Sequence, residues 1–237
     1  MVRVMCSGRV DPVFVLRAFA KGVDGVFIGG CRLNECNYTT HGNYDTLNMV
    51  LLYKRIMEHI GLNPERLHIA FMSGAEANLF AETVNGFVER VKKIGPLGKA
   101  EAIHPETLLA RLAEVTKLVP YIKRVNQEKL ATRLHDPAEY DRLFTQSDVE
   151  KMFSEIVAYY IDPAKCQACM ICARRCPEEA ISGGKNQIHV VDQAKCIKCE
   201  TCFVVCPTRF NAVMKIAGAP VPPPLPEDQR TFVRQKA

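Results

Sequence analysis

A tandem cysteine repeat near the carboxyl end constrains this chain more than any other feature of its sequence. Eight of the 11 cysteines lie between residues 166 and 206, in two copies of the pattern CxxCxxCxxxCP that are offset by 30 residues. The preceding sequence also matches, since Ile161-Asp162 corresponds to Val191-Asp192. A repeat this short is one supersecondary unit used twice, and we expect the two copies to share a core that neither could form alone. The first copy contains Cys166, Cys169, Cys172 and Cys176, and the second contains Cys196, Cys199, Cys202 and Cys206.

The spacing of these cysteines indicates the metal that they bind. A 4Fe-4S cluster takes four thiolates, one for each iron, and three cysteines at two-residue gaps can curl around one side of it while the fourth comes from elsewhere. Zinc sites use four ligands in pairs, and a single CxxC also suits a redox dithiol. Two complete three-plus-one runs in tandem therefore predict two 4Fe-4S clusters, with zinc or structural thiols as the alternative.

From Ile161 to Val213 the sequence resembles bacterial two-cluster ferredoxins. The resemblance implies a small α+β fold, with short strands near residues 159–162 and 188–191 and a short helix after the last cysteine of each run. It also implies that this last cysteine serves the other cluster, and that the proline after it turns the chain sharply. The implied ligand sets are Cys166, Cys169, Cys172 and Cys206 for one cluster, and Cys196, Cys199, Cys202 and Cys176 for the other.

Composition and charge exclude several other classes of protein. With 48% apolar and 24% charged residues, the chain has an ordinary globular composition, which argues against a disordered or fibrous protein. No apolar run approaches the roughly 20 residues that a membrane span requires, and no secretion signal opens the sequence, so we predict a soluble, cytoplasmic protein. The net charge of +5 comes from basic residues scattered among acidic ones, which does not indicate a nucleic-acid surface.

The amino-terminal half alternates predicted strands and helices, which is typical of an α/β domain with a parallel sheet and helical crossovers. Asp11 before Pro12 is a good start for a first helix, and Ser73 with Glu76 forms a capping box for the last one. The predicted strands cover residues 2–5, 25–29 and 67–71, and the predicted helices cover residues 12–21, 44–60 and about 73–94.

The other three cysteines lie in this half, near the ends of the first two predicted strands. Cys6 follows the strand at 2–5, Cys31 follows the strand at 25–29, and Cys36 lies on the loop after it. Because the carboxyl ends of parallel strands form the functional edge of an open sheet, these thiols can meet and hold a metal centre. They can equally be inert buried thiols, or Cys31 and Cys36 can form a redox dithiol.

Several linked motifs in residues 2–96 are similar to the delta subunit of methyl-viologen-reducing hydrogenase. They are Cys6-Ser-Gly-Arg9-Val-Asp-Pro12, Gly30-Cys31 with Cys36 and Tyr38, Gly42-Asn43-Tyr44, and Gly61-Leu-x-Pro64-Glu-Arg66-Leu67. The resemblance implies an iron–sulfur electron-transfer subunit, usually with a 2Fe-2S cluster. It further implies a connection from a hydrogenase, formate dehydrogenase or other donor subunit to the flavin subunit of a heterodisulfide-reductase-like complex. Some relatives carry fused ferredoxin modules.

The resemblance also implies a further strand–helix unit with additional cysteine at the start of the domain, and this sequence begins inside that pattern. Cys6, Cys31 and Cys36 supply three of the four ligands of a 2Fe-2S cluster. The fourth is expected from His41, from a partner, or from residues missing at the amino terminus. We favour missing residues, and an intact mass of 26.5 kDa for the natively purified protein would contradict this expectation.

Between the two cysteine regions, amphipathic segments predict a helical connector over residues 97–158. Its helices should run from Pro105 to near Pro120, over residues 121–134, from Pro137 for a short distance, and from a capping box of Ser147 and Glu150 to about Tyr159. A Pro-rich tail closes the chain and should be extended and poorly ordered alone. The predicted domains are an α/β domain at 1–96, the connector at 97–158, an α+β ferredoxin-like domain at 159–216 and the tail at 217–237.

These features predict an electron carrier rather than a catalyst. Clusters whose irons all carry thiolates pass single electrons and bind no substrate. The sequence contains no nucleophile–base triad, phosphate loop or GxGxxG motif, and we interpret His41, His68, His104, His135 and His189 as surface or core residues. Electrons would pass between the amino-terminal cysteine site and the two 4Fe-4S clusters. The family resemblance suggests a flavin-based electron-bifurcating complex in an anaerobe.

Two alternatives stay open. One is a thiol–disulfide oxidoreductase that uses Cys31 and Cys36, and the other is a structural adaptor that carries a ferredoxin module and no metal in its amino-terminal domain. Iron content separates the second from a three-cluster protein, because two 4Fe-4S clusters give about eight irons per chain and a 2Fe-2S cluster raises this to about ten.

Overall fold

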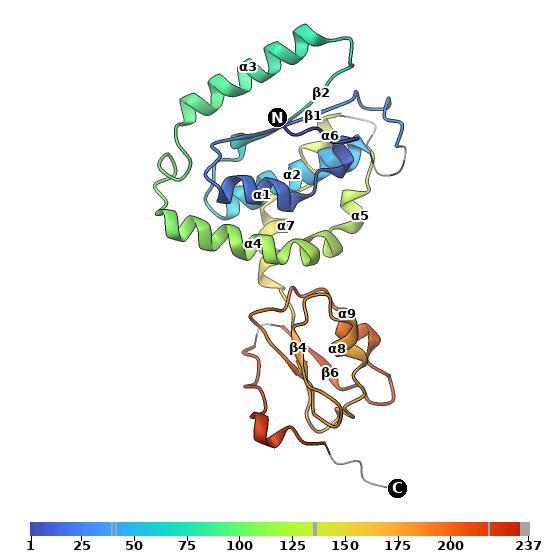
Figure 1. The fold of residues 1–237 in the computed structure, drawn as a ribbon. Helices are drawn as coiled ribbons and strands as arrows, with labels where there is room; N and C mark the ends of the chain where they lie inside the picture. Colours follow the sequence, from blue (N-terminus) through green and yellow to red (C-terminus); the bar gives the residue numbers. More distant parts are fainter. Residues whose placement is uncertain (39, 41, 135–136, 218, 233–237) are drawn as a thin grey trace. The chain divides into compact units, whose positions relative to one another are not determined.

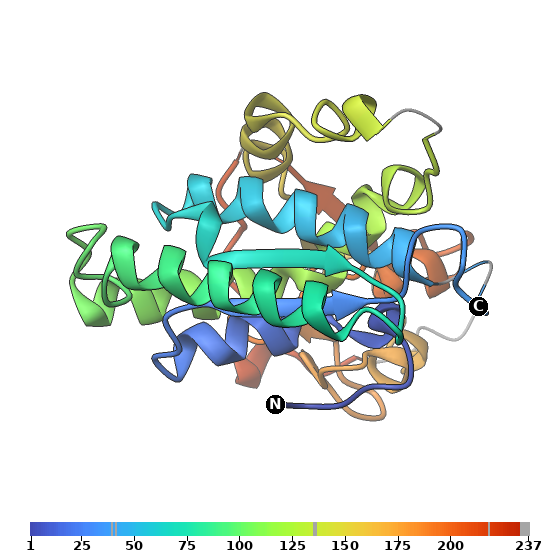
Figure 2. The same ribbon diagram turned by 90° about the horizontal axis from the view of Figure 1, so that it is seen from above.

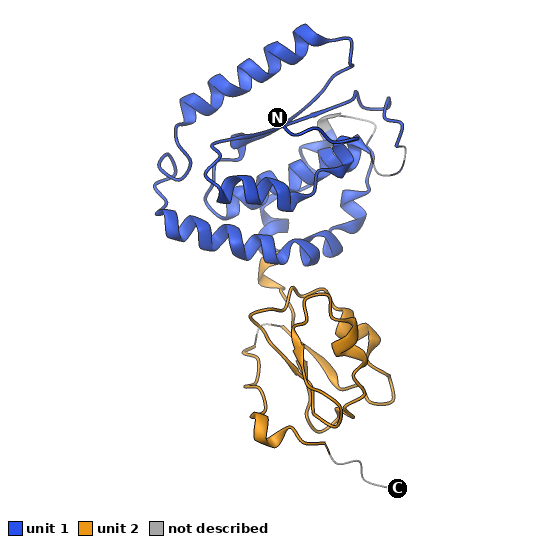
Figure 3. Ribbon diagram, viewed as in Figure 1, with its two compact units in different colours: residues 1–151 blue, residues 152–237 orange. Residues whose placement is uncertain are grey.

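The computed structural model describes residues 1–38, 40, 42–134, 137–217 and 219–232, and contacts divide the chain into two units (Figure 3). The first unit comprises residues 1–151 and the second residues 152–237. In the described parts of the chain, no helix has both the length and the apolar character needed to cross a membrane. The finer division into four domains stays a prediction.

Two parallel strands lie at the centre of the first unit (Figure 1). β1 (Val26–Gly30) pairs with β2 (Leu67–Phe71), and α2 (Asn43–His59) is the crossover between them. α3 (Ala77–Ile94) lies over one face of the strand pair, and α1 (Pro12–Ala20) and α2 lie over the other (Figures 1 and 2). The prediction of a parallel sheet is confirmed for two strands joined by one helical crossover in the part of the chain that is described.

The main core of this unit lies between α1, α2 and α4, which packs along α1. Leu16, Phe19, Leu52, Ile56 and Leu112 are at most 1% exposed, and each contributes about 1.5–3 kcal/mol by its burial. Asp11 caps α1 as predicted, because its carboxylate accepts the N–H of Val13 at 2.9 Å. The remaining elements are η1 (Ser7–Arg9), η2 (Pro64–Arg66), α4 (Pro105–Val125), α5 (Gln127–Leu130), α6 (Pro137–Tyr140) and α7 (Gln146–Ser154).

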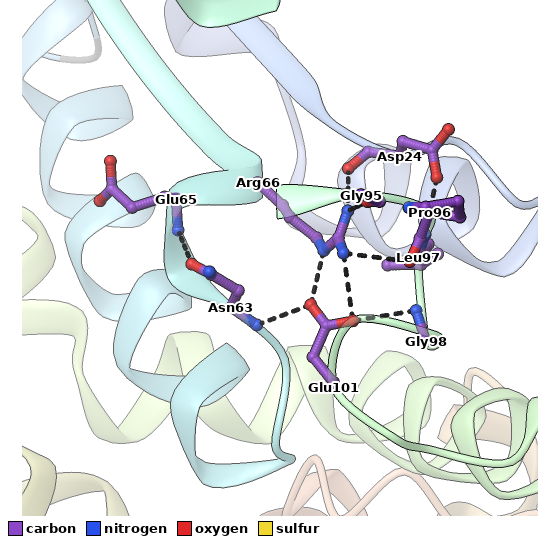
Figure 4. A network of polar contacts seen from close by, with 9 residues as sticks. All are labelled: Asp24, Asn63, Glu65, Arg66, Gly95, Pro96, Leu97, Gly98 and Glu101. Atoms are coloured by element: carbon purple, nitrogen blue, oxygen red, sulfur yellow. Dashed lines mark hydrogen bonds and ion pairs between the residues drawn. The ribbon is translucent and has the colours of Figure 1, made fainter. Parts of the chain in front are cut away.

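A buried arginine joins the loops at the amino ends of the two strands (Figure 4). Arg66 immediately precedes β2, and its side chain is fully buried beside Glu101, which is 7% exposed. The guanidinium makes five hydrogen bonds, so that all of its N–H groups are used. They go to the two oxygens of Glu101 at 2.6 and 3.1 Å, and to the carbonyls of Asp24 at 2.9 Å, Gly95 at 2.9 Å and Pro96 at 3.3 Å.

The predicted strand at residues 2–5 is wrong. Val2 and Met5 are 89% and 87% exposed, and no strand among the described residues pairs with this segment. β-branched residues favour a strand where a sheet edge and an apolar surface receive them, and the exposure of this segment shows that it packs on neither. Cys6 instead precedes the 3-10 turn η1, and its sulfur accepts the N–H of Gly8 at 3.4 Å.

α3 begins at Ala77, later than the capping box of Ser73 and Glu76 predicted. The Glu76 carboxylate does accept the Ser73 N–H, at 2.6 Å. The same carboxylate also forms an ion pair with Arg32, which lies 44 residues away in the sequence. These two contacts hold Glu76 in the position just before the helix, not inside its first turn. A local sequence pattern could not indicate the ion pair with Arg32.

α4 continues through Pro120, where the sequence predicted an end. A proline inside a helix loses one backbone hydrogen bond and costs about 3 kcal/mol. Val119, Tyr121 and Ile122 are at most 4% exposed, and burying them stabilises the helix by about 1.5–3 kcal/mol each. Packing therefore outweighs the proline.

α7 is capped by Thr145 and Asp148 rather than by the predicted pair Ser147 and Glu150. The Thr145 N–H donates to the Asp148 carboxylate at 2.9 Å, and the Asp148 N–H donates to the Thr145 hydroxyl at 3.1 Å. Both pairs have the spacing of a capping box, so the pattern alone does not select between them. The helix ends at Ser154, before the predicted end near Tyr159, because the following residues enter a strand.

In the second unit the two copies of the repeat interlock. β3 (Ala158–Ile161) pairs antiparallel with β6 (Val213–Ile216), and β4 (Ile181–Ser182) pairs antiparallel with β5 (Val190–Val191). Each strand of one copy thus pairs with a strand of the other, and the buried core draws residues from both. The predicted shared core and the strands predicted near 159–162 and 188–191 are confirmed. The other elements are α8 (Ile171–Arg175), α9 (Thr201–Val205) and η3 (Glu227–Gln229).

The short helices of the repeat precede the last cysteine of each run, whereas the sequence placed them after it. α8 ends just before Cys176 and α9 just before Cys206, and both cysteines have extended backbone, with φ, ψ of −71°, 118° and −66°, 125°. Each is followed by a proline, whose ring disfavours the helical region for the residue before it. Pro177 and Pro207 therefore keep the preceding cysteine out of the helix.

The Pro-rich tail packs against the second unit, contrary to the prediction of a poorly ordered segment. The N–H of Ile188 donates to the Arg230 carbonyl at 2.7 Å, and the N–H of Phe232 donates to the Asn186 carbonyl at 2.7 Å. Leu225 and neighbouring prolines line a hollow beside Ile161. The residues after the prolines thus pair with the segment that leads into β5, which composition alone could not indicate.

Candidate functional site

The eight cysteines of the repeat gather in the second unit, four of them inside its core. All eight are free thiols. Cys166, Cys172, Cys196 and Cys202 are 6–8% exposed, and they pack among apolar side chains from both copies. The first and third cysteines of each run are therefore shielded from water.

The loops that carry these cysteines have the same unusual backbone in both copies. Ala168 and Met170 have positive φ angles of 50° and 63°, and the corresponding Lys198 and Glu200 have φ angles of 59° and 70°. The left-handed region costs a non-glycine residue about 1–2 kcal/mol, and such strain persists where surrounding structure enforces it. Two left-handed residues between three cysteines curl each loop tightly, which suits side chains that must converge on one centre.

Thiols of the first predicted set lie close to one another. Burial, and after it the neighbouring thiols of Cys166, Cys169 and Cys206, together raise the pKa of the Cys172 thiol to about 12. Cys206 comes from the other copy of the repeat. Cys206 packs against the same core as Cys172, so thiols of both runs lie in one part of the second unit.

The second predicted set shares one cavity. Cys176 from the first run lines this cavity together with Cys196, Cys199 and Cys202, and Tyr159 lies beside them. Burial also raises the pKa of Cys202 to about 12, with contributions from Cys196, then Cys172 and Cys199. Both crossed sets are therefore compatible with the positions of the thiols.

The donor chemistry fits iron–sulfur clusters. Several buried thiols crowded together resist ionisation, because each thiolate would lie near other negative charges in a medium of low dielectric. Iron removes that obstacle, because a bound cation lowers the pKa of the thiols that coordinate it, and these thiols are then deprotonated. The Cys176 sulfur already accepts the N–H of Ala180 at 3.3 Å, the kind of contact that orients a thiolate ligand.

His189 lies beside the first set, and sequence reasoning missed this contact. Its ring Nδ1 is 3.7 Å from the Cys166 sulfur, and the residue is 1% exposed. Burial lowers the pKa of His189. The interpretation of this histidine as a surface or core residue is correct as to its burial, but the neighbouring thiol could not be read from the spacing.

The three amino-terminal cysteines meet at the carboxyl ends of β1 and β2. The sulfurs of Cys6 and Cys36 are 3.6 Å apart. Cys31 directly follows β1, and its pKa is raised by burial and by the neighbouring Cys36 thiol. All three line a cavity of about 610 Å³. The predicted convergence at this edge of the sheet is therefore present, although Cys6 reaches it from the turn η1 and not from a strand.

The three thiols differ in their electrostatic surroundings. Burial raises the pKa of Cys6. For Cys36, burial also opposes ionisation, but hydrogen bonds from the backbone N–H groups of Tyr38 and Asn43 and from the thiols of Cys6 and Cys31 together outweigh it and lower the pKa of this thiol. Asn43 is the first residue of α2, so Cys36 lies at the positive end of a helix. Cys36 is thus the thiol of this group that favours the thiolate.

Asn43 also fixes the position of Cys31. Its side-chain amide donates to the carbonyls of Cys31 at 2.8 Å and Arg32 at 2.7 Å, and it lies 3.5 Å from the Cys31 sulfur. Asn43 is 1% exposed, so these contacts are shielded from water. One buried residue therefore holds Cys31 through its side chain and Cys36 through its backbone.

Gly42 gives Cys36 room to approach the other thiols. A Cβ atom on Gly42 would lie 2.4 Å from the Tyr38 carbonyl oxygen and 2.6 Å from the Cys36 sulfur. Distances this short force the backbone to move, because the nearest atom belongs to the main chain. Glycine at this position is therefore part of the site.

We expect Gly42→Ala to separate Cys6 from Cys36. In the metal-free chain, mild oxidation should cross-link the wild-type pair, and peptide mass mapping measures the yield. The variant should lower the yield about tenfold, since overpacking costs about 1–3 kcal/mol. Gly86→Ala is the matched control, because a Cβ on Gly86 meets nothing within 4 Å. Equal yields from the Gly42 variant and the wild type would contradict this account of the site.

The remaining candidate ligands are not placed by the structure. His41, proposed from the sequence as a fourth ligand, and His135 lie outside the described residues. Within the described ranges, no three His, Cys, Asp or Glu side chains converge in the way that a single metal ion requires. Metal binding by Cys6, Cys31 and Cys36 stays a prediction.

Comparisons with known proteins match the two cysteine regions separately. Residues 1–95 match the family described as methyl-viologen-reducing hydrogenase, delta subunit. Residues 165–211 match the family described as 4Fe-4S dicluster domain. Both matches agree with the resemblances drawn from the sequence motifs.

Individual relatives cover the amino-terminal region. The chain is 42% identical over 96 residues to an iron-sulfur subunit of the F420-non-reducing hydrogenase of Archaeoglobus profundus. The matched residues make up 40% of this chain and 69% of that protein. It is 45% identical over 95 residues to the vhu iron-sulfur subunit of the F420-non-reducing hydrogenase of Methanococcus maripaludis, covering 40% of this chain and 70% of that protein.

A longer relative shares the same region. The chain is 45% identical over 98 residues to one of the subunits of the ferredoxin/F420H2-dependent CoB-CoM heterodisulfide reductase of Methanosarcina acetivorans. That match covers 41% of this chain but 12% of the relative, so the chain spans a small part of the heterodisulfide reductase protein.

Proposed function

Because this chain belongs to the family of methyl-viologen-reducing hydrogenase delta subunits, we propose that it is an iron–sulfur subunit that relays single electrons within an oxidoreductase complex. The observation that carries the proposal is the gathering of free thiols from both runs of the repeat in one core, in the same chain as the delta-subunit region. The proposed donor is a hydrogenase, formate dehydrogenase or other dehydrogenase. The proposed acceptor is the flavin subunit of a heterodisulfide-reductase-like, electron-bifurcating complex in the cytoplasm.

The residues of the repeat would hold two 4Fe-4S clusters, through the thiolates of the two crossed sets. Such clusters, when bound, accept and release one electron at a time. The chain supplies the surroundings. Buried apolar side chains exclude water, left-handed residues curl the loops, and the prolines after Cys176 and Cys206 end the helices just before these two thiols. Thiolates on every iron would leave no position for a substrate.

The amino-terminal thiols would hold a 2Fe-2S cluster, together with a fourth ligand other than these three. Cys36 supports this proposal, since backbone N–H groups and the start of α2 favour its thiolate form. Cys6 and Cys31 lie close enough to join it. In this proposal residues 1–96 form the α/β domain, 97–158 the helical connector, 159–216 the ferredoxin-like domain and 217–237 the tail.

Anaerobic purification of the full chain with its untagged partners tests the proposal. We expect a brown complex that contains a flavin-bearing subunit, with about ten irons in this chain, and signals from reduced clusters in low-temperature EPR spectra. Colourless protein, or protein that contains zinc in place of iron, would rule out electron transfer by these sites. About eight irons would retain the two 4Fe-4S clusters and reject the 2Fe-2S cluster.

A second candidate function is thiol–disulfide exchange at the amino-terminal cysteines. The 3.6 Å separation of the Cys6 and Cys36 sulfurs favours it, because thiols this close can form a disulfide with little movement. Cys31 and Cys36, the pair expected from the sequence, are also neighbours. Replacing Cys36 with serine separates the candidates. An electron-transfer subunit loses a cluster signal and electron flow through the complex, whereas a dithiol enzyme loses disulfide turnover and keeps its iron.

A further inference from the structure

His189 is a buried histidine whose ring makes one hydrogen-bond contact among the described residues, to a cysteine. Its Nδ1 lies 3.7 Å from the sulfur of Cys166. Its other ring nitrogen, Nε2, is buried and has no hydrogen-bond partner in the described part of the chain. A buried imidazole with one polar contact is oriented by that contact, because leaving both nitrogens unpaired would cost more.

The surrounding backbone is shaped to seat this ring. Gly183 has a φ of +132°, and a Cβ atom there would lie 3.0 Å from the His189 Cα, 3.1 Å from Cδ2 and 3.2 Å from Cγ. Any side chain at this position would push the imidazole out of place. On either side of His189, the N–H of Ile188 bonds to the Arg230 carbonyl at 2.7 Å, and Val191 pairs with Ile181. The ring is therefore held in position from several directions.

The two copies of the repeat differ at this position. The offset of 30 residues aligns His189 with Tyr159. Tyr159 is also 1% exposed, and it lines the cavity of Cys176, Cys196, Cys199 and Cys202. Each set of thiols thus has one buried ring from the corresponding position, an imidazole beside the first set and a phenol beside the second. The core is closely symmetric in its cysteines and asymmetric in these rings.

Resting on the ligand sets of the proposed function, we propose that the Nδ1–H of His189 donates a hydrogen bond to the Cys166 thiolate. This bond raises the reduction potential of the cluster that Cys166 holds above that of the other cluster. A thiolate bound to iron carries no proton and can only accept, so the hydrogen lies on Nδ1 and Nε2 is a bare acceptor. Reduction increases the negative charge on the ligand sulfurs, and a donor therefore stabilises the reduced state more than the oxidised one.

The test is a redox titration of the full chain, followed by EPR under anaerobic conditions. In the wild type we expect two unequal midpoint potentials for the two 4Fe-4S clusters, whose EPR signals are followed separately from that of the proposed 2Fe-2S cluster. His189→Phe should make the higher midpoint potential more negative. At a fixed solution potential, the ratio of reduced to oxidised cluster should then fall about tenfold, which is equivalent to about 59 mV for one electron. The other potential should stay the same. Tyr159→Phe is the control at the corresponding position and should leave the higher potential unchanged.

A conservative variant and a label separate this effect from a general loss of structure. His189→Asn keeps an N–H near the place of Nδ1 and should retain most of the higher potential. In the wild type, ¹⁵N-histidine gives a specific probe, because His189 is the only histidine in residues 152–237. Pulsed EPR should detect its nitrogen coupled to one reduced 4Fe-4S cluster in the wild type and not in His189→Phe, which separates it from the histidines of residues 1–151.

The outcomes distinguish this inference from the proposed function. If the wild type binds about eight or more irons but His189→Phe leaves both potentials unchanged, the hydrogen bond has no influence and the inference is wrong. Equal potentials in the wild type, or no nitrogen coupling, would also overturn it while leaving the two clusters intact. A wild-type protein without iron would instead overturn the proposed function itself.

Discussion

Replacing Arg66 with alanine is expected to lower the free energy of unfolding of the first unit by about 3–5 kcal/mol. The change leaves the Glu101 carboxylate, which is 7% exposed, without its counter-charge. Burial alone would raise the pKa of Glu101, and the Arg66 guanidinium with the N–H groups of Asn63 and Gly98 holds it below its ordinary value instead. Three backbone carbonyls lose their donor in the same step (Figure 4).

The size of this effect follows from the place of Arg66 in the fold. The residue precedes β2, and its bonds join the segment before β1 to the end of α3 and to the loop before α4. These segments meet at the amino ends of the strands, whereas Cys6, Cys31 and Cys36 gather at the carboxyl ends. One arginine thus holds the sheet from the side opposite to the cysteines.

Hydrogen exchange of the backbone amides of β1 and β2 measures this prediction, and exchange in β3 and β6 of the second unit provides an internal reference. Arg90→Ala is the matched control, because Arg90 is 40% exposed and pairs with Glu65 at 3.4 Å. An exposed pair contributes about 0–1 kcal/mol, so its loss should barely change the exchange. If the two arginine variants had equal effects, the buried network would not be what stabilises the strands.

A double variant separates the lost bonds from the unpaired charge. Arg66→Met combined with Glu101→Leu removes both charges, and replacing a whole buried pair is often far less destabilising than removing one partner. We therefore expect the double variant to recover part of the loss. A double variant as unstable as Arg66→Ala would mean that the bonds to Asp24, Gly95 and Pro96 carry the whole effect.

Features set by local pattern could be predicted from the sequence, and features set by distant contacts could not. The strand at 67–71, the helix after Asp11 and the shared core of the repeat all follow from residues that are close in sequence or regularly spaced. The start of α3 depends on Arg32, and the order of the tail depends on Arg230 pairing with the chain before β5. No local motif records such contacts.

The same limit applies to the cysteine sites. The meeting of Cys31 and Cys36 with Cys6 could be predicted from the ends of parallel strands, although the strand expected before Cys6 is absent from the described residues. The sequence motif around Arg66 can be recognised, but arginine side chains are usually exposed. The complete burial of Arg66 therefore could not be predicted from the sequence. The contact of His189 with Cys166 was missed, although the 30-residue offset could have shown that His189 replaces Tyr159 in the repeat.

Pairs of alanine substitutions in the tandem repeat should reveal which thiols share a cluster. Cys206→Ala combined with Cys166→Ala removes two ligands from one crossed set, and we expect about four irons to remain in one complete cluster of the second unit. Cys206→Ala combined with Cys196→Ala removes one ligand from each crossed set, so that no cluster keeps four thiolates. Iron and acid-labile sulfide per chain, with EPR of the reduced protein, distinguish the two results.

The pairing of variants makes the result independent of how well a damaged cluster survives. If each run of four cysteines served its own cluster, the two outcomes would exchange, and Cys206→Ala with Cys196→Ala would keep one complete cluster. The structure favours the crossed outcome for two reasons. Cys176 lines the cavity of Cys196, Cys199 and Cys202, and strands of one copy pair with strands of the other. Because strands of one copy pair with strands of the other, we expect the last cysteine of each run to bind the cluster of the other run. Removal of Cys206 should therefore affect the cluster that the first three cysteines of the first run hold.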